Sequence, residues 1–311
     1  MKNKITIIGA GYVGATIAYA LTLKGIAEDI VLVDIDEKKA QAEADDIQHG
    51  VAAMGNSVVR AGTYADTADS DLIVITAGRN RNPTETRLDM IHDNIGIMKD
   101  VCEQLKKHGA RGVVLLVSNP VDVLTYYCDK WLGLPDGTVF GTGCTLDTSR
   151  LLRAVADYTG SPVSEVSGYV IGEHGESQVP LWSSIAVQGK PVAEYCMLHG
   201  LIWNEAIRQT IQNRVKSLGT QIIAAKGRTH YGIATCVCML ADAVLHQKET
   251  VASVTSRLNG EYGLHEVALS LPCIISGKGI VRKQMSILTD EEQAKLKNSA
   301  DKLASTLMEM S

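Results

Sequence analysis

Four short segments contain polar side chains that could do chemistry together. They are TRLD at 86–89, SNPVD at 118–122, LDTSR at 146–150 and GEHGES at 172–177. An imidazole such as that of His174 can accept and release a proton near neutral pH, because its unperturbed pKa is about 6.5. A guanidinium can hold a planar carboxylate through two parallel hydrogen bonds, and a carboxylate can fix the tautomer of an imidazole. These residue types suit proton transfer on a small acid.

A glycine-rich turn, GAGYVG at 9–14, follows the apolar run at 5–8 and opens a helical stretch. Gly9 is expected to make the tight turn, and Gly11 to let the backbone approach a diphosphate. Gly14 is expected to let the helix pack closely on the strand. The diphosphate would bind at the helix N-terminus, where free N–H groups and the helix dipole attract anions.

An acidic residue, Asp34, ends the second apolar run, 20 residues after Gly14. A carboxylate at this point accepts hydrogen bonds from the adenosine ribose hydroxyls and repels a 2′-phosphate. The sequence therefore favours NAD over NADP. The alternative for Asp34 is an ordinary acid at the end of a strand.

The first half of the chain alternates continuous apolar runs with helical patterns. Such runs are what a parallel sheet covered on both faces requires. We predict an α/β fold with a doubly wound parallel Rossmann sheet, which the short run at 139–140 ends. The expected strands are 5–8, 30–33, 72–75, 113–117 and 139–140, and the first two helices are 11–24 and 37–49.

After about residue 144 the pattern changes to long helical stretches mixed with strand-like pieces. The expected helices are 147–158, 203–226 and 232–246, the expected strands 166–171 and 267–271, and a last helix opens at 289–292 with the spacing of a capping box. This half is predicted to be an α+β domain. We predict an NAD-binding domain at 1–143 and a catalytic, substrate-binding domain at 144–311.

Composition excludes several classes of protein. The 311 residues carry a net charge of −5 with no long basic run, which gives no support to a nucleic-acid or anionic-membrane partner. The apolar segment at 5–8 is too short for a signal peptide, and no stretch is long enough to span a bilayer, so we expect a cytoplasmic protein. The seven cysteines include no CxxC pair and no zinc spacing. We expect small buried side chains and no metal.

Taken in order, GAGYVG, SNPVD, LDTSR and GEHGES resemble the lactate/malate dehydrogenase family over nearly the whole chain. The resemblance implies an NAD-dependent oxidoreductase that acts on a small L-2-hydroxy acid. It makes His174 the acid/base, Asp147 the carboxylate that orients it, and Arg150 the group that binds the substrate carboxylate. Arg87 would polarise the reacting carbonyl, and Asn119 would touch both the substrate and the nicotinamide ribose.

These implied roles agree with elementary chemistry. In the oxidation of a secondary alcohol a hydride moves to nicotinamide while a base removes the hydroxyl proton, and a guanidinium beside the carbonyl stabilises the oxygen charge that develops in the reverse direction. The expected cofactor contacts are Gly9, Gly11, Val13, Gly14, Asp34, Tyr64, Gly78, Asn94, Val117 and Asn119.

The choice of hydroxy acid depends on Arg81, six places before Arg87. Lactate enzymes of this family usually carry Gln there and malate enzymes Arg. An arginine would pair with the second carboxylate of malate or oxaloacetate, whereas with pyruvate it would face a methyl group. We therefore favour malate, with L-lactate as the alternative. The alternative for Arg81 itself is a solvated loop charge.

Other features of the sequence look more like lactate enzymes. The TRLD and GEHG forms are of this kind, and Thr229 stands where lactate enzymes place a threonine against the small substrate side chain. Asn82 and Thr84 depart from the Lys and Gly usual in the loop.

The resemblance also bears on regulation and assembly. Lactate enzymes activated by fructose 1,6-bisphosphate carry an arginine and a histidine where this chain has Leu152 and Ser167. We expect no such phosphate site. The resemblance implies a homotetramer, with a homodimer as the alternative.

Two rival classes are a non-catalytic NAD-binding relative and an NAD-dependent glycosidase of related fold. The first would have little reason to keep His174, Asp147, Arg150 and Arg87 together. The second would need a divalent metal held by Cys and His, and the GEHG and LDTSR segments argue against it.

Overall fold

The computed structural model describes residues 3–79 and 87–310, and its first half forms the predicted parallel sheet. Neighbouring strands in the order β3-β2-β1-β4-β5-β6 are all parallel. The side chains of β1, β4 and β5 are buried along their whole length, as continuous apolar runs predicted. The strands are β1 (Lys4–Ile8), β2 (Asp29–Val33), β3 (Val58–Ala61), β4 (Leu72–Ile75), β5 (Val113–Leu116) and β6 (Val139–Gly141).

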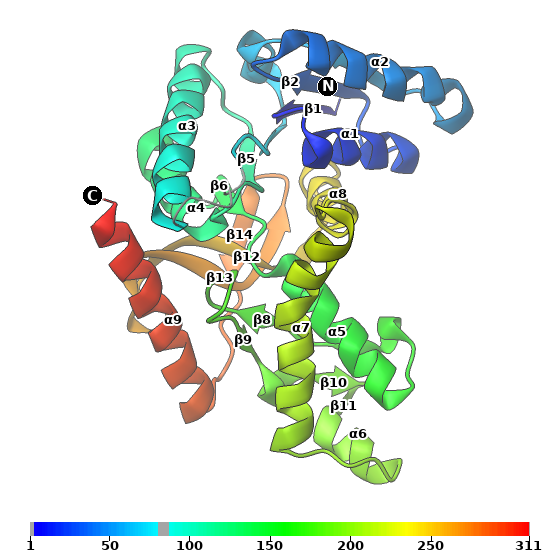
Figure 1. Ribbon diagram of the computed structural model, residues 1–311, viewed down its shortest axis with the longest axis vertical. Helices are drawn as coiled ribbons and strands as arrows, with labels where there is room; N and C mark the ends of the chain where they lie inside the picture. Colours follow the sequence, from blue (N-terminus) through cyan, green and yellow to red (C-terminus); the bar gives the residue numbers. More distant parts are fainter. Residues whose placement is uncertain (1–2, 80–86, 311) are drawn as a thin grey trace.

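Helices cover both faces of this sheet, because successive residues of each buried strand point to opposite sides. In β4, Ile73 and Ile75 join the cluster that contains α3 (Arg87–Lys107) and α4 (Val121–Leu132). Leu72 and Val74 join the cluster on the other face, with α1 (Tyr12–Lys24), α2 (Glu37–Met54) and α8 (Tyr231–Leu245). Figure 1 shows α3 and α4 on one side of the strands and α1 on the other. The predicted doubly wound fold is confirmed.

The prediction that this sheet ends at 139–140 is wrong. β6 pairs with the antiparallel strand β12 (Thr250–Asn259), opposite Thr255, and the sheet continues through β13 (His265–Ser276) and β14 (Gly279–Lys283). In the described part of the chain this gives one sheet of nine strands. The strand β12 was missed because hydroxyl residues interrupt its apolar pattern, yet the buried hydroxyls of Ser253 and Thr255 donate hydrogen bonds inside the protein. The predicted division at residue 143 stays a prediction.

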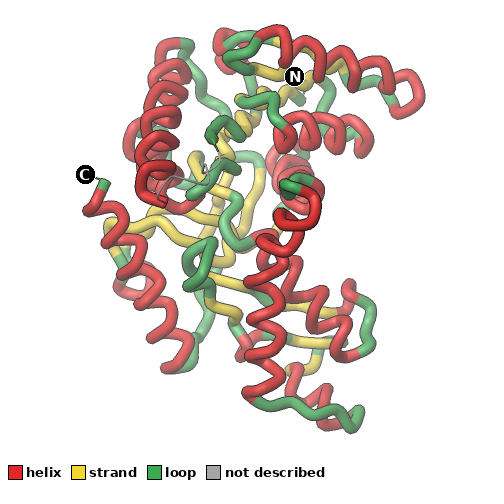
Figure 2. Tube along the Cα trace, in the orientation of Figure 1, coloured by secondary structure: helices red, strands yellow, loops and turns green. Residues whose placement is uncertain are grey.

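The second half contains the long helices expected there. They are α5 (Thr145–Thr159), α7 (Glu205–Lys226), α8 and α9 (Asp290–Glu309), with a short α6 (Val192–Leu198) between α5 and α7. Thr289 and Glu292 form the predicted capping box of α9. Figure 2 shows these helices outside the yellow strands.

The strand predicted at 166–171 is instead two short strands in different sheets. Gly168 takes a φ of +144°, which breaks the extended run between β7 (Val166–Ser167) and β8 (Val170–Ile171). The remaining strands are β9 (Val179–Pro180), β10 (Ala186–Val187) and β11 (Lys190–Pro191), and the 3₁₀ helices are η1 (Tyr64–Asp69), η2 (Val163–Glu165), η3 (Trp182–Ser184) and η4 (Glu261–Gly263).

Two further observations concern the cysteines and the helices. All seven cysteines are buried and free, as predicted. Among the described residues, no helix combines the length and the apolar character needed to cross a membrane.

The turn at 9–14 should be sensitive to size at one glycine and tolerant at its neighbour. A Cβ on Gly14 would lie 1.9 Å from the carbonyl oxygen of Gly9, whereas a Cβ on Gly11 would meet no heavy atom within 4 Å. We expect Gly14→Ala to lower the free energy of unfolding by about 2 kcal/mol through overpacking. Gly11→Ala, the matched control, should lose only a few tenths. Thermal unfolding followed by circular dichroism measures both, and equal melting temperatures would contradict this account of the turn.

Candidate active site

The glycine turn at the carboxyl end of β1 has the geometry of an anion site. Gly9 has a φ of +104°, and a Cβ there would lie 2.7 Å from the backbone nitrogen of Ala77. Only glycine fits that position. Since Gly11 is the N-cap of α1 and has no side chain, the first N–H groups of the helix are not capped by one. The open space beside Gly11 suits the close approach of a diphosphate.

The carboxylate of Asp34 lies beside this turn, directly after β2. One of its oxygens accepts a hydrogen bond from the backbone N–H of Ala10 at 2.6 Å, and the other accepts from the N–H of Asp36 at 3.0 Å. These bonds hold the acid where the ribose of a bound dinucleotide would lie relative to the diphosphate turn.

Asn94 connects two further segments of the predicted cofactor site. It is 2% exposed on α3, and its side chain accepts from the N–H of Arg79 at 2.9 Å and donates to the carbonyl oxygen of Asn119 at 2.8 Å. Gly78 and Arg79 follow β4, and Asn119 follows β5. Asn94 therefore ties together the carboxyl ends of neighbouring parallel strands, the edge at which such sheets bind ligands.

The other predicted cofactor residues lie near the same strands. Val117 is buried directly after β5, Tyr64 is half-buried at the start of η1, and Val13 is half-buried in α1 against the main core. Their roles as cofactor contacts stay predictions.

The predicted acid/base pair lies where the first turn of α5 meets the segment after β8. The Nδ1 of His174 is 2.6 Å from one carboxylate oxygen of Asp147, and the Nη1 of Arg150 donates to the other at 3.2 Å. The side chain of Asp147 is 2% exposed, against 27% for His174 and 17% for Arg150. A buried carboxylate thus contacts an imidazole and a guanidinium that both keep an exposed part for a ligand.

The electrostatics of this cluster favour a charged pair. Burial alone would raise the pKa of Asp147, but the charges and hydrogen bonds of His174 and Arg150 outweigh it and hold that pKa below its ordinary value. Burial opposes the imidazolium, yet the carboxylates of Asp147 and Asp122 raise the pKa of His174 to about 9. His174 is therefore an acid at neutral pH; its Nδ1 contacts Asp147, and among the described residues its Nε2 has no hydrogen-bond partner and can serve a ligand.

Three of the predicted substrate residues are less fully described. Arg81 lies outside the described residues. Arg87 is the first residue of α3, and Thr229 is half-buried in the segment that joins α7 to α8. Their roles stay predictions.

Sequence reasoning missed the residues that fix the backbone of His174 by hydrogen bonds. The carboxylate of Asp122 accepts the backbone N–H of His174 at 2.7 Å, and Thr255 donates to the same carboxylate. Asp122 belongs to the SNPVD segment, so its motif was a usable signal. Thr255 is one of several hydroxyl residues in a strand, and nothing local marks it.

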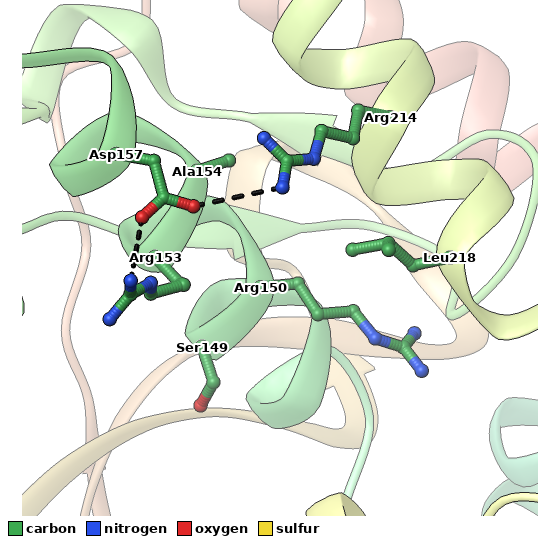
Figure 3. Close-up of a pocket in the computed structure, with 7 residues that line it drawn as sticks. All are labelled: Ser149, Arg150, Arg153, Ala154, Asp157, Arg214 and Leu218. Carbon is green, nitrogen blue, oxygen red and sulfur yellow. Dashed lines mark ion pairs between the residues drawn. The ribbon is translucent and has the colours of Figure 1, made fainter. Parts of the chain in front are cut away.

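A separate cavity lies between α5 and α7 and shares only Arg150 with the candidate site. It has a volume of about 220 Å³ and is lined by Ser149, Arg150, Arg153, Ala154, Asp157, Arg214 and Leu218. Figure 3 shows Asp157 paired with Arg153, at 2.8 Å, and with Arg214, at 3.7 Å, while Arg150 points away from it. Among the described residues, no cluster of three His, Cys, Asp or Glu side chains could hold a metal ion.

Comparison with known proteins agrees with this arrangement. A family model for the NAD binding domain of lactate/malate dehydrogenase matches residues 3–141, and a model for the alpha/beta C-terminal domain of the same family matches residues 144–311. An L-lactate dehydrogenase from Thermoanaerobacter sp. (strain X514) is 41% identical over 308 residues, which cover 99% of both chains. One from Clostridium perfringens (strain SM101 / Type A) is 39% identical over 96% of this chain and 94% of its own.

Solved structures give the same result. The ligands-bound crystal structure of the minor L-lactate dehydrogenase from Enterococcus mundtii superposes with a TM-score of 0.96 at 35% identity, covering 100% of this chain and 99% of that one. A lactate dehydrogenase from a Medee basin deep-sea metagenome library gives a TM-score of 0.95 at 34% identity, with the same coverage. The protein therefore belongs to the lactate/malate dehydrogenase family, and its cofactor is NAD.

Proposed function

We propose that the protein is an L-lactate dehydrogenase, which interconverts pyruvate and L-lactate. The contact of 2.6 Å between His174 and Asp147 carries the chemical part of the proposal, because it supplies a poised proton donor. The substrate part is supported by the relatives, which are named L-lactate dehydrogenase. Thr229 and the TRLD and GEHG forms favour the same substrate.

Each site residue would have a separate role in hydride and proton transfer. NAD, when bound, supplies or accepts the hydride. In reduction the Nε2 of His174 donates its proton to the carbonyl oxygen, and Asp147 stabilises the imidazolium before transfer. In oxidation the neutral imidazole removes the hydroxyl proton. The Nη1 of the Arg150 guanidinium donates to Asp147, and its other nitrogens would hold the substrate carboxylate.

A second candidate function is malate dehydrogenase, which the sequence analysis favoured. Its specific support is Arg81, whose charge would pair with a second substrate carboxylate and would have no partner in a complex with pyruvate. The names of the relatives favour lactate instead. The homotetramer and the cytoplasmic location stay predictions.

Removing the imidazole should abolish chemistry and spare cofactor binding. His174→Ala is expected to lower kcat by about three orders of magnitude or more, because the general acid/base and its paired charge are both lost. NADH affinity, measured by fluorescence titration, should stay within a few-fold of wild type. The matched control is His265→Ala, at an exposed histidine on β13, which should leave both quantities unchanged. Retained turnover in His174→Ala would remove this residue from the mechanism.

A comparison of kcat/KM for pyruvate and oxaloacetate, with NADH oxidation as the readout, tests which substrate the enzyme prefers. The lactate proposal expects pyruvate to be preferred. Arg81→Gln should then change the ratio of the two values by less than about tenfold, because the arginine would be a solvated loop charge. A preference for oxaloacetate that Arg81→Gln shifts toward pyruvate by about 100-fold or more would establish malate instead.

The rate of reduction should depend on pH through the raised pKa of His174. Reduction needs the imidazolium, so kcat/KM for the oxo acid should be flat at neutral pH and fall tenfold per unit above about 9. Oxidation of the hydroxy acid needs the neutral imidazole and should rise over the same range. Asp147→Asn removes the main charge that favours the imidazolium, so the fall should move to lower pH. A midpoint near 6.5 in the wild type would contradict the paired-charge account.

A further inference from the structure

The segment that carries His174 is fixed by three successive backbone hydrogen bonds. The N–H of Gly172 donates to the carbonyl oxygen of Ser270 at 2.9 Å, and the N–H of Glu173 donates to the Oγ of Ser299 at 2.7 Å. The N–H of His174 donates to the Oδ2 of Asp122 at 2.7 Å. Three different elements thus hold the segment, and of the three acceptors only Asp122 can carry a charge.

Asp122 is the start of a buried hydrogen-bond chain that also reaches α5. It is 3% exposed, and its second oxygen accepts from the hydroxyl of Thr255 at 2.5 Å. That hydroxyl is 3.1 Å from the Oγ of Ser270, which accepts the N–H of Cys144 at 3.0 Å. Cys144 is the N-cap of α5, the helix that carries Asp147. One carboxylate is therefore connected to both members of the acid/base pair.

The position of Asp122 in its own helix favours the charged form. It lies in the first turn of α4, where the helix dipole stabilises an anion. Burial raises its pKa to about 6, while the hydrogen bond from Thr255 and the charge and N–H of His174 act against that rise. At neutral pH and above, Asp122 is an anion behind the imidazole.

The imidazole of His174 is thus faced by charges from several elements. Asp147 and Arg150 come from α5 and Asp122 from α4, while Glu173 of the segment itself acts on Asp122. Asp147 makes the direct contact with the ring, and Asp122 adds a second negative charge from the backbone side. A buried carboxylate costs desolvation free energy that a neutral acceptor, such as the Ser299 hydroxyl that accepts the N–H of Glu173, would avoid.

We propose that Asp122 is a positioning residue of the reaction: its buried charge holds the backbone of His174 and, together with Asp147, stabilises the imidazolium that donates the proton when the oxo acid is reduced. The inference rests on the proposed function, in which His174 is the proton donor. It adds that the acidity of His174 is set by two carboxylates, of which one touches the ring and the other only the main chain.

The test is Asp122→Asn, read as the pH profile of kcat/KM for reduction of pyruvate or oxaloacetate, whichever the wild type prefers. The amide has the shape of the carboxylate and can accept the same N–H, so the substitution removes the charge and keeps the bond. We expect the fall near pH 9 to move down by about one unit. The deficit would be roughly eight-fold at pH 9.5 and less than about two-fold at pH 7.

The matched control is Ser299→Ala, which removes the neutral acceptor of the neighbouring N–H. Loosening the segment without a change of charge should lower kcat equally at every pH and leave the midpoint in place. A purely structural role for Asp122 predicts the same behaviour for Asp122→Asn. An unmoved midpoint in Asp122→Asn, with an active wild type, would overturn this inference alone.

Two further outcomes are decisive. If Asp122→Asn does not fold, Asp122→Ser offers a smaller neutral residue and the same downward shift is expected. Loss of folding in both would make Asp122 a structural residue and overturn the proposal. Wild-type turnover that survives His174→Ala would overturn the proposed function, and this inference with it.

Discussion

A buried carboxylate that must be satisfied from two sides organises the candidate active site. Asp147 is almost fully removed from water, and its two oxygens contact His174 and Arg150 separately. Loss of either partner would leave part of a buried charge uncompensated. The first turn of α5 and the segment after β8 must therefore keep a fixed separation, although Asp147 and His174 are 27 positions apart in the sequence. Much of the second half of the molecule can be understood as the support for that separation.

The predicted cofactor side depends on a different constraint, which is backbone geometry. Parallel strands end at one edge of the sheet, so the glycine turn, Asp34 and Asn119 arrive at the same place without contacts between their side chains. Gly9 and Gly14 allow α1 to approach β1 closely, and Asn94 ties the ends of β4 and β5. Hydride transfer needs both the cofactor and the acid/base pair, and different kinds of contact hold these two parts of the site in place.

Sequence reasoning succeeded where the signal is local. Apolar runs, the turn at 9–14 and the segments around Asp147 and His174 are contiguous, and each carries its own physical rule. It failed where tertiary contacts decide. In β12 apolar residues are mixed with hydroxyl residues. The hydrogen-bond partners of Thr255, which come from distant parts of the chain, explain why this residue is buried. Gly168 splits one expected strand into two through its positive φ, which could not be predicted from the neighbouring residues.

The substrate shows a different limit of sequence reasoning. Arg81 and the remainder of the chain favour different acids, because one side chain can change the charge of a pocket while hundreds of others preserve the ancestry of the fold.

The junction between the two halves has a mechanical consequence. Gly143, where the chain passes from one half to the other, has a φ of +47°, and a Cβ there would lie 2.2 Å from the Oγ of Ser270 and 2.6 Å from the Oγ1 of Thr255. Thr255 also pairs with Gly141 where the parallel strands meet the antiparallel ones. A hinge motion at this point would break both the backbone pairing of the sheet and the hydrogen bonds between the hydroxyl groups behind His174. Because the sheet is continuous from β6 to β12, we expect the two halves to move little relative to each other and a substrate to enter and leave through displacements at the rim of the candidate site.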